Sequence, residues 1–304
     1  MAAAAALVAA ESVLALTPIA IKKTPISPIL AIWTRTLSSS FLGYLITGDR
    51  TVSTNDMPTA GAIGYMNLLH IASSYESFRN LPAGQAMSIL YTYPIWNLIF
   101  NAQFRGEVIG TVEYAAISVA AMGSALLNID PGAAAPTALG RKTDYGWGLF
   151  MGIVMALTES AMHVLLKGVG WRDPAKSVWV VSTSASVWLG AFMGLQALVG
   201  SAAGTREMLE SKGTLLDTVW LTLFHAITMF SGYWLRFYAV PRLSTVTYSI
   251  LSYAGLFASY LFGIFILGER PGWMSLLGAL IIVGSGLVLQ LSKPVAESPE
   301  KDSA

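Results

Sequence analysis

An internal repeat is the feature of this sequence that most restricts its fold. Residues 81–128 are echoed by residues 242–291, with short identical segments in the same order. The matching segments are Ser88-Ile89-Leu90 with Ser249-Ile250-Leu251, Gly106-Glu107 with Gly268-Glu269, and Gly123-Ser124 with Gly284-Ser285. We therefore expect the chain to fold as two copies of one unit.

Each copy holds about five hydrophobic segments. The length of each segment is close to the 20 residues that a helix needs to cross a bilayer. We expect spanning helices near residues 3–21, 27–46, 59–80, 83–104, 110–129, 145–167, 175–200, 215–238, 243–267 and 272–291. An odd number of crossings makes the second copy enter the membrane from the opposite side. The sequence therefore predicts an all-α integral membrane protein, with about ten transmembrane helices as two inverted five-helix repeats around a central cavity.

The limits of the two copies follow from polar and breaker-containing stretches. We assign residues 1–133 to the first five-helix repeat, 134–144 to a linker, 145–291 to the second five-helix repeat, and 292–304 to a disordered polar tail. The tail is too polar to pack. Pro18 and Pro94 lie inside two of the predicted helices and should kink them.

The composition agrees with a membrane protein and excludes several function classes. Of the 304 residues, 54% are hydrophobic and 12% are charged, about half the charged share of a soluble domain. A net charge of +1 gives no footprint for nucleic acid. With no cysteine, there is no disulfide, thiol nucleophile or thiolate metal site. Since no metal-ligand spacing, nucleophile elbow or phosphate loop is present either, we expect neither an enzyme nor a cofactor.

Two glutamates at matching positions of the two copies are the leading candidates for a functional site. Glu11 and Glu159 each precede a serine, and each lies near the middle of a predicted spanning helix. An ionised carboxylate at that depth costs about 3 kcal/mol or more. If the pair meets between the copies, repulsion between the carboxylates suits proton exchange, and a shared cation would relieve it. The alternative is that each is a neutral acid hydrogen-bonded to a neighbouring helix.

The three histidines are further candidates. His70 and His225 occupy matching mid-helix positions and could relay protons or bind a polar ligand, because imidazole titrates near neutral pH. The alternative is a neutral ring that bridges two helices. His163 follows Glu159 by four residues and shares its helix face. This spacing favours a hydrogen-bonded Glu–His unit.

Two arginines lie within predicted helices. Arg35 is near the middle of the helix at 27–46, where it could neutralise Glu11, bind a substrate carboxylate or serve as a structural charge partner. Arg236 is near the end of the helix at 215–238, and we expect it to extend to the membrane interface.

Two tyrosines are the deepest of a set of aromatic residues in the predicted helices at 83–104 and 243–267. Tyr91 and Tyr253 could stack an organic ligand or cation. Aromatic residues are also common at membrane interfaces for reasons unrelated to ligands.

Together these patterns resemble the drug/metabolite transporter superfamily, in particular its ten-helix, EamA-like members. The residues that carry the resemblance are Ala20-Ile21-Lys22-Lys23, Ser27-Pro28 and Arg35 near the start, Gly106-Glu107 and Gly123 in the first half, and Leu267-Gly268-Glu269-Arg270, Leu277-Gly278 and Val283-Gly284 in the second. The resemblance implies two inverted five-helix halves around a central cavity, with the last helix of each half structural. Residues 249–262 lack the basic pair of the superfamily's phosphate carriers, which argues against a phosphate substrate.

We expect a secondary transporter of a small organic metabolite or cation that works by alternating access, with proton coupling through Glu11 and Glu159. The acids favour a cationic or zwitterionic solute, whereas Arg35 and the histidines leave an anionic metabolite open. The alternatives are a lipid-headgroup flippase of the same fold and a non-transporting membrane scaffold. The expected partners are a small-molecule substrate, the lipid bilayer and protons, and a homodimer stays open.

Overall fold

The computed structural model describes residues 1–105, 110–127, 129, 143–169, 171, 173–200, 211–239, 242–243 and 245–292. Residues 134–142 of the predicted linker and 293–304 of the predicted tail lie outside this part. Within the described residues the chain is all-helical, which confirms the predicted fold class at that level.

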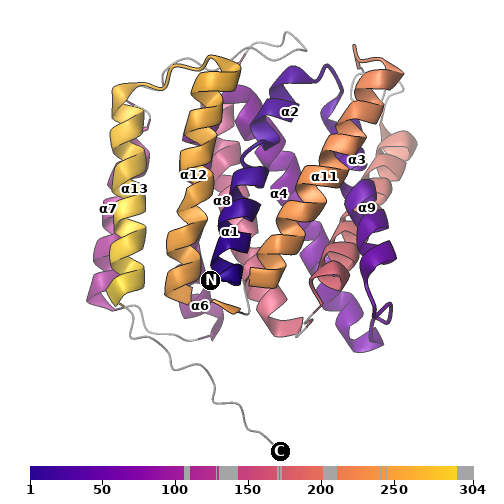
Figure 1. Cartoon of the computed structure of the whole chain (residues 1–304), viewed down its shortest axis with the longest axis horizontal. Helices are drawn as coiled ribbons and strands as arrows, with labels where there is room; N and C mark the ends of the chain where they lie inside the picture. The colour runs from indigo at the N-terminus through magenta and orange to yellow at the C-terminus, as the bar shows by residue number, and fades with distance from the viewer. Residues whose placement is uncertain are drawn as a thin grey trace, which may run out of the picture.

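Most of the helices lie side by side in a bundle, with their axes roughly aligned (Figure 1). Their bounds are α1 Ala2–Leu14, α2 Thr17–Lys23, α3 Pro28–Ile46, the 3₁₀ turn η1 Thr54–Asp56, α4 Met57–Asn80, α5 Ala83–Leu90, α6 Tyr93–Arg105, α7 Thr111–Leu126, α8 Tyr145–Val169, α9 Pro174–Val199, α11 Leu215–Ala239, α12 Thr245–Leu267 and α13 Trp273–Ser292. Each predicted segment coincides with one helix, except that 3–21 comprises α1 and α2 and 83–104 comprises α5 and α6.

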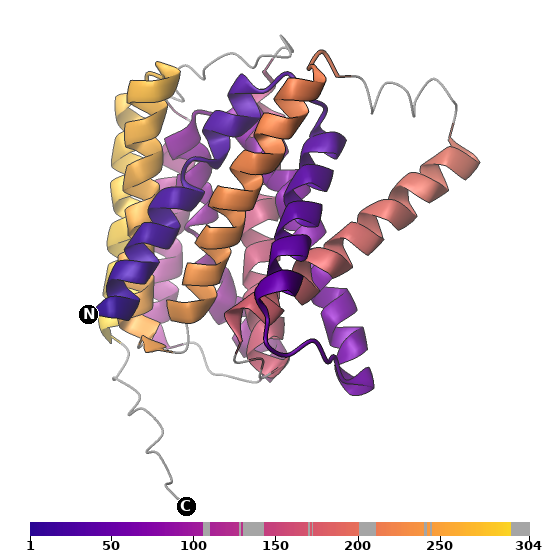
Figure 2. The ribbon, with the colours of Figure 1, turned by 45° about the vertical axis from the view of Figure 1, so that its right-hand side comes forward.

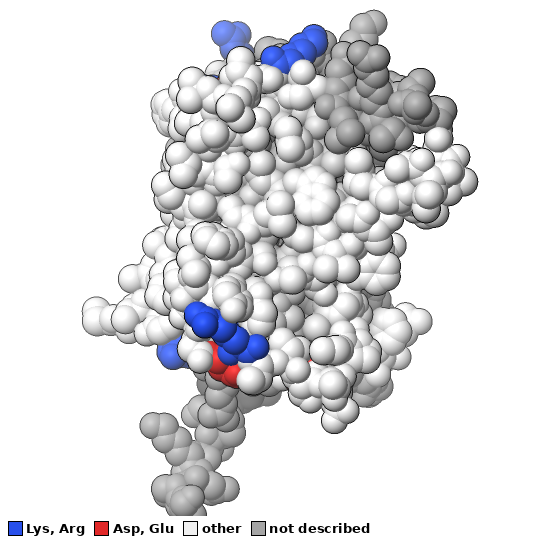
Figure 3. All heavy atoms as spheres, turned by 90° about the vertical axis from the view of Figure 1, so that its right-hand side faces the viewer, with Lys and Arg blue, Asp and Glu red and all other residues white. Residues whose placement is uncertain are grey.

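Five helical stretches of the described part are long and apolar enough to cross a membrane, judged by length and composition. They are Ala2–Lys23, Pro28–Ile46, Tyr145–Leu166, Pro174–Val199 and Leu215–Ala239. Two shorter apolar stretches, Leu251–Leu267 and Trp273–Val288, lie near the C-terminal end. On the face drawn in Figure 3, charged side chains gather at the two ends and the band between them is uncharged.

Two of the predicted segments are broken at a proline. The α1–α2 break at Ala15–Leu16 precedes Pro18, as the α5–α6 break precedes Pro94. Proline has no N–H to donate to the carbonyl four residues earlier. At the first break the Thr17 hydroxyl donates instead to the Leu14 carbonyl, at 2.6 Å. The two predicted kinks are therefore confirmed.

The bundle has a packed centre and two outer edges. α4 packs against α8 and α9, while α11 packs against α1 and α3, and α12 lies between α1 and α5. α7 and α13 pair with each other at one edge (Figure 1). At the opposite edge α9 leans away from the bundle (Figure 2). The interior is formed by α1, α3, α4, α5, α8, α11 and α12, together with the part of α9 that carries the buried residues Val178, Val181 and Ser182.

The α7–α13 pair shows why its small residues matter. A Cβ placed on Gly123 would lie 2.9 Å from the Gly278 carbonyl oxygen, and one on Gly278 would lie 2.6 Å from the Gly123 carbonyl oxygen. The two backbones therefore approach so closely that only glycine fits at these positions, as is usual where helices pack through small residues.

Candidate functional site

The two candidate glutamates are joined by one arginine in the middle of the bundle. Arg236 of α11 donates through Nε to Glu11 Oε1 at 2.8 Å and through Nη2 to Glu11 Oε2 at 3.2 Å. Its Nη1 donates to Glu159 Oε1 at 2.8 Å. All three side chains are buried. The structure thus brings the two glutamates together, with the cation that relieves their repulsion supplied by the chain itself.

The prediction that Arg236 extends to the membrane interface is wrong. Arg236 lies in the last turn of α11, and Cα–Cβ bonds in a helix lean toward its N-terminus. A side chain in the last turn is therefore directed back along the helix into the bundle. One sequence signal for this was available: Arg236 follows His225 by eleven residues, about three helical turns, so the two share one face of α11.

Glu11 is also held by a tyrosine from the α5–α6 break. The Tyr91 hydroxyl donates to Glu11 Oε2 at 2.8 Å, and both residues are buried. A Cβ on Gly255 of α12 would collide with the Tyr91 hydroxyl and lie 3.2 Å from Glu11 Cβ. Gly255 therefore makes the Glu11–Tyr91 contact sterically possible. Tyr253 packs its ring 5.6 Å from that of Tyr91.

Glu159 lies beside a histidine from the neighbouring helix. His70 Nδ1 is 3.5 Å from Glu159 Oε2 and 3.2 Å from the Met155 carbonyl oxygen, which belongs to the same helix α8. His70 thus binds α4 to α8 next to the carboxylate. His163 lies in α8, but its side chain is outside the described residues, so the predicted Glu159–His163 unit is not described.

His225 is placed differently from His70, although the two occupy matching positions of the repeat. Its Nδ1 is 3.0 Å from the Thr34 hydroxyl of α3, and its Nε2 is 3.0 Å from the Tyr75 hydroxyl of α4. The ring is completely buried. His225 therefore joins three helices through neutral partners, whereas His70 stands next to an acid.

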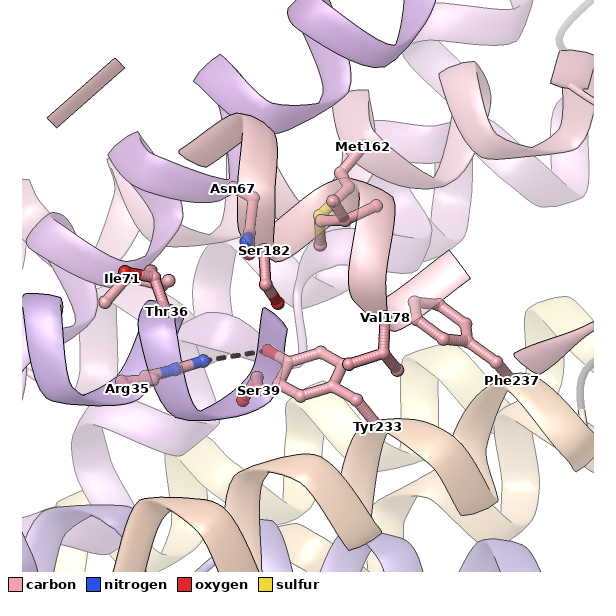
Figure 4. Close-up of a pocket in the computed structure, with 11 residues that line it drawn as sticks. Arg35, Thr36, Ser39, Asn67, Ile71, Met162, Val178, Ser182, Tyr233 and Phe237 are labelled. Carbon is pink, nitrogen blue, oxygen red and sulfur yellow. Dashed lines mark hydrogen bonds between the residues drawn. The ribbon is translucent and has the colours of Figure 1, made fainter. Parts of the chain in front are cut away.

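Arg35 does not neutralise Glu11, since that role belongs to Arg236. Arg35 Nη2 donates to the Tyr233 hydroxyl at 3.0 Å, as Figure 4 shows. The Tyr233 ring centre is 5.7 Å from the Arg35 guanidinium carbon and 5.9 Å from that of Arg236. Both distances are within the range of cation–π attraction. Tyr233 therefore links Arg35 to the Glu11–Arg236–Glu159 network, which we call the central network.

A small cavity adjoins Arg35 and Tyr233. About 350 Å³ of empty space lies at this site, part of it continuous with open solvent, and the narrow inner part has room for about one water molecule. It is lined by Arg35, Thr36, Ser39, Asn67, Ile71, Met162, Val178, Val181, Ser182, Tyr233 and Phe237. Neither glutamate is among these residues. The site is therefore narrow in the conformation described, and we call it the central cavity.

A second buried ion pair lies where α2, α5 and the α12–α13 turn meet. Lys22 Nζ donates to a Glu269 carboxylate oxygen and, at 2.9 Å, to the Leu81 carbonyl. The other Glu269 oxygen accepts from the Ala83 N–H at 2.7 Å, which satisfies a free donor in the first turn of α5. Sequence reasoning gave Lys22 no role, since its acidic partner lies 247 residues away.

More exposed ion pairs lie at the ends of helices. Lys176 Nζ is 2.5 Å from Asp49 Oδ2, and the hydrogen bond from this ammonium keeps the pKa of Asp49 below its usual range. Arg79 Nη1 is 2.9 Å from Glu76 Oε1, three residues earlier on α4. Among the described residues no group of three or more histidine, aspartate or glutamate side chains could hold a metal ion.

No family model matches the chain, and no curated protein matches it in sequence. In contrast, 26 chains of solved structures are similar to it. One of them, described only as the crystal structure of a protein, has a TM-score of 0.60 and 14% sequence identity, and the similarity covers 97% of this chain and 98% of the other. At that identity the likeness concerns the fold alone.

Proposed function

We propose that this chain is a secondary transporter of a small organic solute that works by alternating access. Its ten predicted spans would form two inverted five-helix halves, as in the drug/metabolite transporter superfamily that the sequence resembles. The central network would couple proton movement to the movement of the solute.

The pattern of helix contacts supports the inverted halves. α4 packs on α8 and α9, and its counterpart α11 packs on α1 and α3, which are the counterparts of α8 and α9. Likewise α5 and α6 contact α8, while their counterpart α12 contacts α1. Three further pairs, α3 with α9, α5 with α12 and α7 with α13, join counterparts to each other. If a twofold axis relates the two halves, each contact between one helix and a helix of the other half is repeated between their counterparts. The transport site would then lie where the two halves meet.

The observation that carries the proposal is the meeting of Glu11 and Glu159 at one arginine beside a polar cavity. One cation between two carboxylates leaves one negative charge, so the group can take up a proton without gaining net positive charge. Protonation of a carboxylate would weaken its bond to Arg236 and alter the contact between Arg236 and Tyr233, which lines the cavity. Proton binding and the shape of the solute site would thereby be linked.

The position of the polar groups favours a solute carrier over a lipid-headgroup flippase. The lining of the central cavity includes one charged side chain, Arg35, together with hydroxyl and amide groups. The groove between α7 and α13 is lined almost wholly by apolar side chains, with Thr111 and Ser285 as its polar members. Such a groove offers a charged headgroup few partners.

The proposal is tested with purified protein in liposomes that enclose a pH-sensitive dye. A proton gradient is imposed, and a panel of amines, amino acids, hydroxy acids and nucleosides is added. We expect Glu159→Gln to reduce solute-dependent proton flux at least tenfold, because the amide cannot exchange a proton. Glu76→Gln is the matched control, since Glu76 pairs with Arg79 at the end of α4, and it should keep wild-type flux. Unchanged flux in folded Glu159→Gln protein would remove Glu159 from the mechanism.

A further inference from the structure

We infer that Arg35 binds the carboxylate of a small organic anion in the central cavity, and that this anion enters together with a proton. The inference rests on the proposed transport function and adds the chemical class of the solute to it. It reverses the preference for a cationic solute that the two glutamates suggest in the sequence.

The first reason is the charge of Arg35. Its side chain is buried, and among the described residues no acidic group lies within ion-pair distance of it. A guanidinium has five N–H donors, and its described side-chain acceptor is the Tyr233 hydroxyl. A buried cation without a counter-ion is costly, and a carboxylate offers it two parallel hydrogen bonds.

The second reason is that the two buried glutamates already pair with Arg236. Glu11 and Glu159 both accept hydrogen bonds from Arg236, and neither lines the cavity. The one charged residue of the lining is Arg35. An ammonium group in the cavity would therefore meet a like charge, whereas a carboxylate would meet an opposite one.

The remaining lining suits an organic anion better than an inorganic one. Thr36, Ser39, Asn67 and Ser182 supply hydroxyl and amide groups beside Arg35. Apolar side chains, among them Phe237, line the rest of the cavity. Figure 4 shows the Arg35 guanidinium directed at the Tyr233 hydroxyl, with Phe237 farther along α11. The cavity as described has room for about one water molecule, so a solute would enter only after the helices around it separate. In the opened cavity, a solute with a carboxylate, a hydroxyl and a small apolar part would find a partner for each.

The third reason concerns the sum of buried charges. Glu11 and Glu159 balance Arg35 and Arg236, so this set is neutral when empty. A monoanion adds one negative charge, which is expensive in a low-dielectric interior, and one proton taken up by the central network restores neutrality. The geometry thus favours joint binding of one carboxylate and one proton.

Binding is tested on the purified protein in detergent by thermal unfolding. The probes are sodium lactate, lactamide, ethanolamine hydrochloride and sodium chloride, at equal concentration and constant ionic strength. Lactate and lactamide differ only in carboxylate against amide. We expect lactate to raise the melting temperature in a concentration-dependent way and the other three to leave it unchanged. Equal stabilisation by lactamide, ethanolamine or chloride would overturn the assignment.

The role of Arg35 is tested with Arg35→Gln and Arg35→Lys. We expect the apparent Kd for lactate to rise at least tenfold in Arg35→Gln, and less in Arg35→Lys, which keeps the charge. Arg50→Gln is the control, since Arg50 is exposed and lies over the Tyr44 ring outside the cavity. Wild-type lactate affinity in folded Arg35→Gln protein would overturn the proposal. If Arg35→Gln does not fold, the discrimination between lactate and lactamide by the wild-type protein decides.

Flux measurements in liposomes separate this inference from the proposed function. We expect inward lactate movement to carry protons inward, above the rate in protein-free vesicles, and Arg35→Gln to lose it. Lactate binding through Arg35 without flux would support the anion site and refute transport. Flux of an amine or a neutral solute that is unaffected by Arg35→Gln, with lactate neither bound nor moved, would support transport and refute the anion site.

Discussion

The two buried clusters of charge in this molecule are built from different kinds of partner. The Lys22–Glu269 pair also binds backbone, through the Leu81 carbonyl and the Ala83 N–H, where two helices join. In the central network, the hydrogen bonds from Arg236 to Glu11 and Glu159 join side chain to side chain. The first cluster holds the connection between α4 and α5 in place, because its backbone partners lie at the ends of these two helices.

We infer from this difference that the Lys22–Glu269 pair is structural, whereas the central network has the proposed role in transport. Movement of Lys22 or Glu269 would expose unsatisfied backbone groups at the start of α5, which is expensive in an apolar surrounding. The central network can change its hydrogen bonds by rotation of side chains, without loss of any helical hydrogen bond. It is also linked to the central cavity through Tyr233, whose ring lies beside Arg236 and which lines that cavity. Three substitution experiments can break or sharpen this comparison.

The largest effect is expected from Arg236→Met. Removal of the shared cation leaves two facing carboxylates without compensation, and breaking a buried ion pair in this way costs about 3–5 kcal/mol. The free energy of unfolding in mixed detergent micelles measures this loss. Arg50→Met, at an exposed arginine, should change stability by less than about 0.5 kcal/mol. An Arg236→Met protein as stable as the control would show that the network does not hold α1, α8 and α11 together.

A pair of double variants tests the assignment of roles directly. Lys22→Gln with Glu269→Gln should lower the melting temperature and keep solute flux within about twofold of wild type, because the pair is structural. Glu11→Gln with Arg236→Gln removes one charge of each sign, so we expect folded protein with flux reduced at least tenfold. Flux in liposomes and melting temperature are measured for both. Loss of flux in the first variant, with normal stability, would make the Lys22–Glu269 pair part of the mechanism.

A smaller effect is expected from Tyr91→Phe. The substitution removes the hydroxyl that donates to Glu11, and hydrogen bonds to charged groups contribute about 1.5–3 kcal/mol. Tyr253→Phe is the matched control, because Tyr253 contacts Tyr91 through its ring and keeps that contact as phenylalanine. Unfolding free energies of the two variants give the comparison. Equal losses would mean that the Tyr91–Glu11 hydrogen bond contributes no more to stability than the Tyr253 hydroxyl does.

The helices could be placed from the sequence because they depend on local patterns. A run of about 20 apolar residues predicts a helix wherever the rest of the chain lies, and Pro18 and Pro94 mark their breaks by their own chemistry. The two glutamates could be singled out for the same reason, since a carboxylate in an apolar run is costly by itself.

The partners of these charges could not be predicted in the same way. Arg236 lies 225 residues from Glu11 along the chain, and Tyr233 owes its importance to two arginines on different helices. Gly255 matters because of the atoms packed against it, and no local pattern records those. Which residues come into contact across the bundle is set by the packing of the helices.

The Thr17 hydroxyl bound to the Leu14 carbonyl has a consequence for how the first predicted span can move. At an ordinary helix position, bending opens the bond between an N–H and the carbonyl four residues earlier, which must then be satisfied in another way. Here that bond is already absent at Pro18, and a neighbouring side chain supplies the substitute. The angle between α1, which carries Glu11, and α2, which carries Lys22, can therefore change without the loss of that main-chain bond.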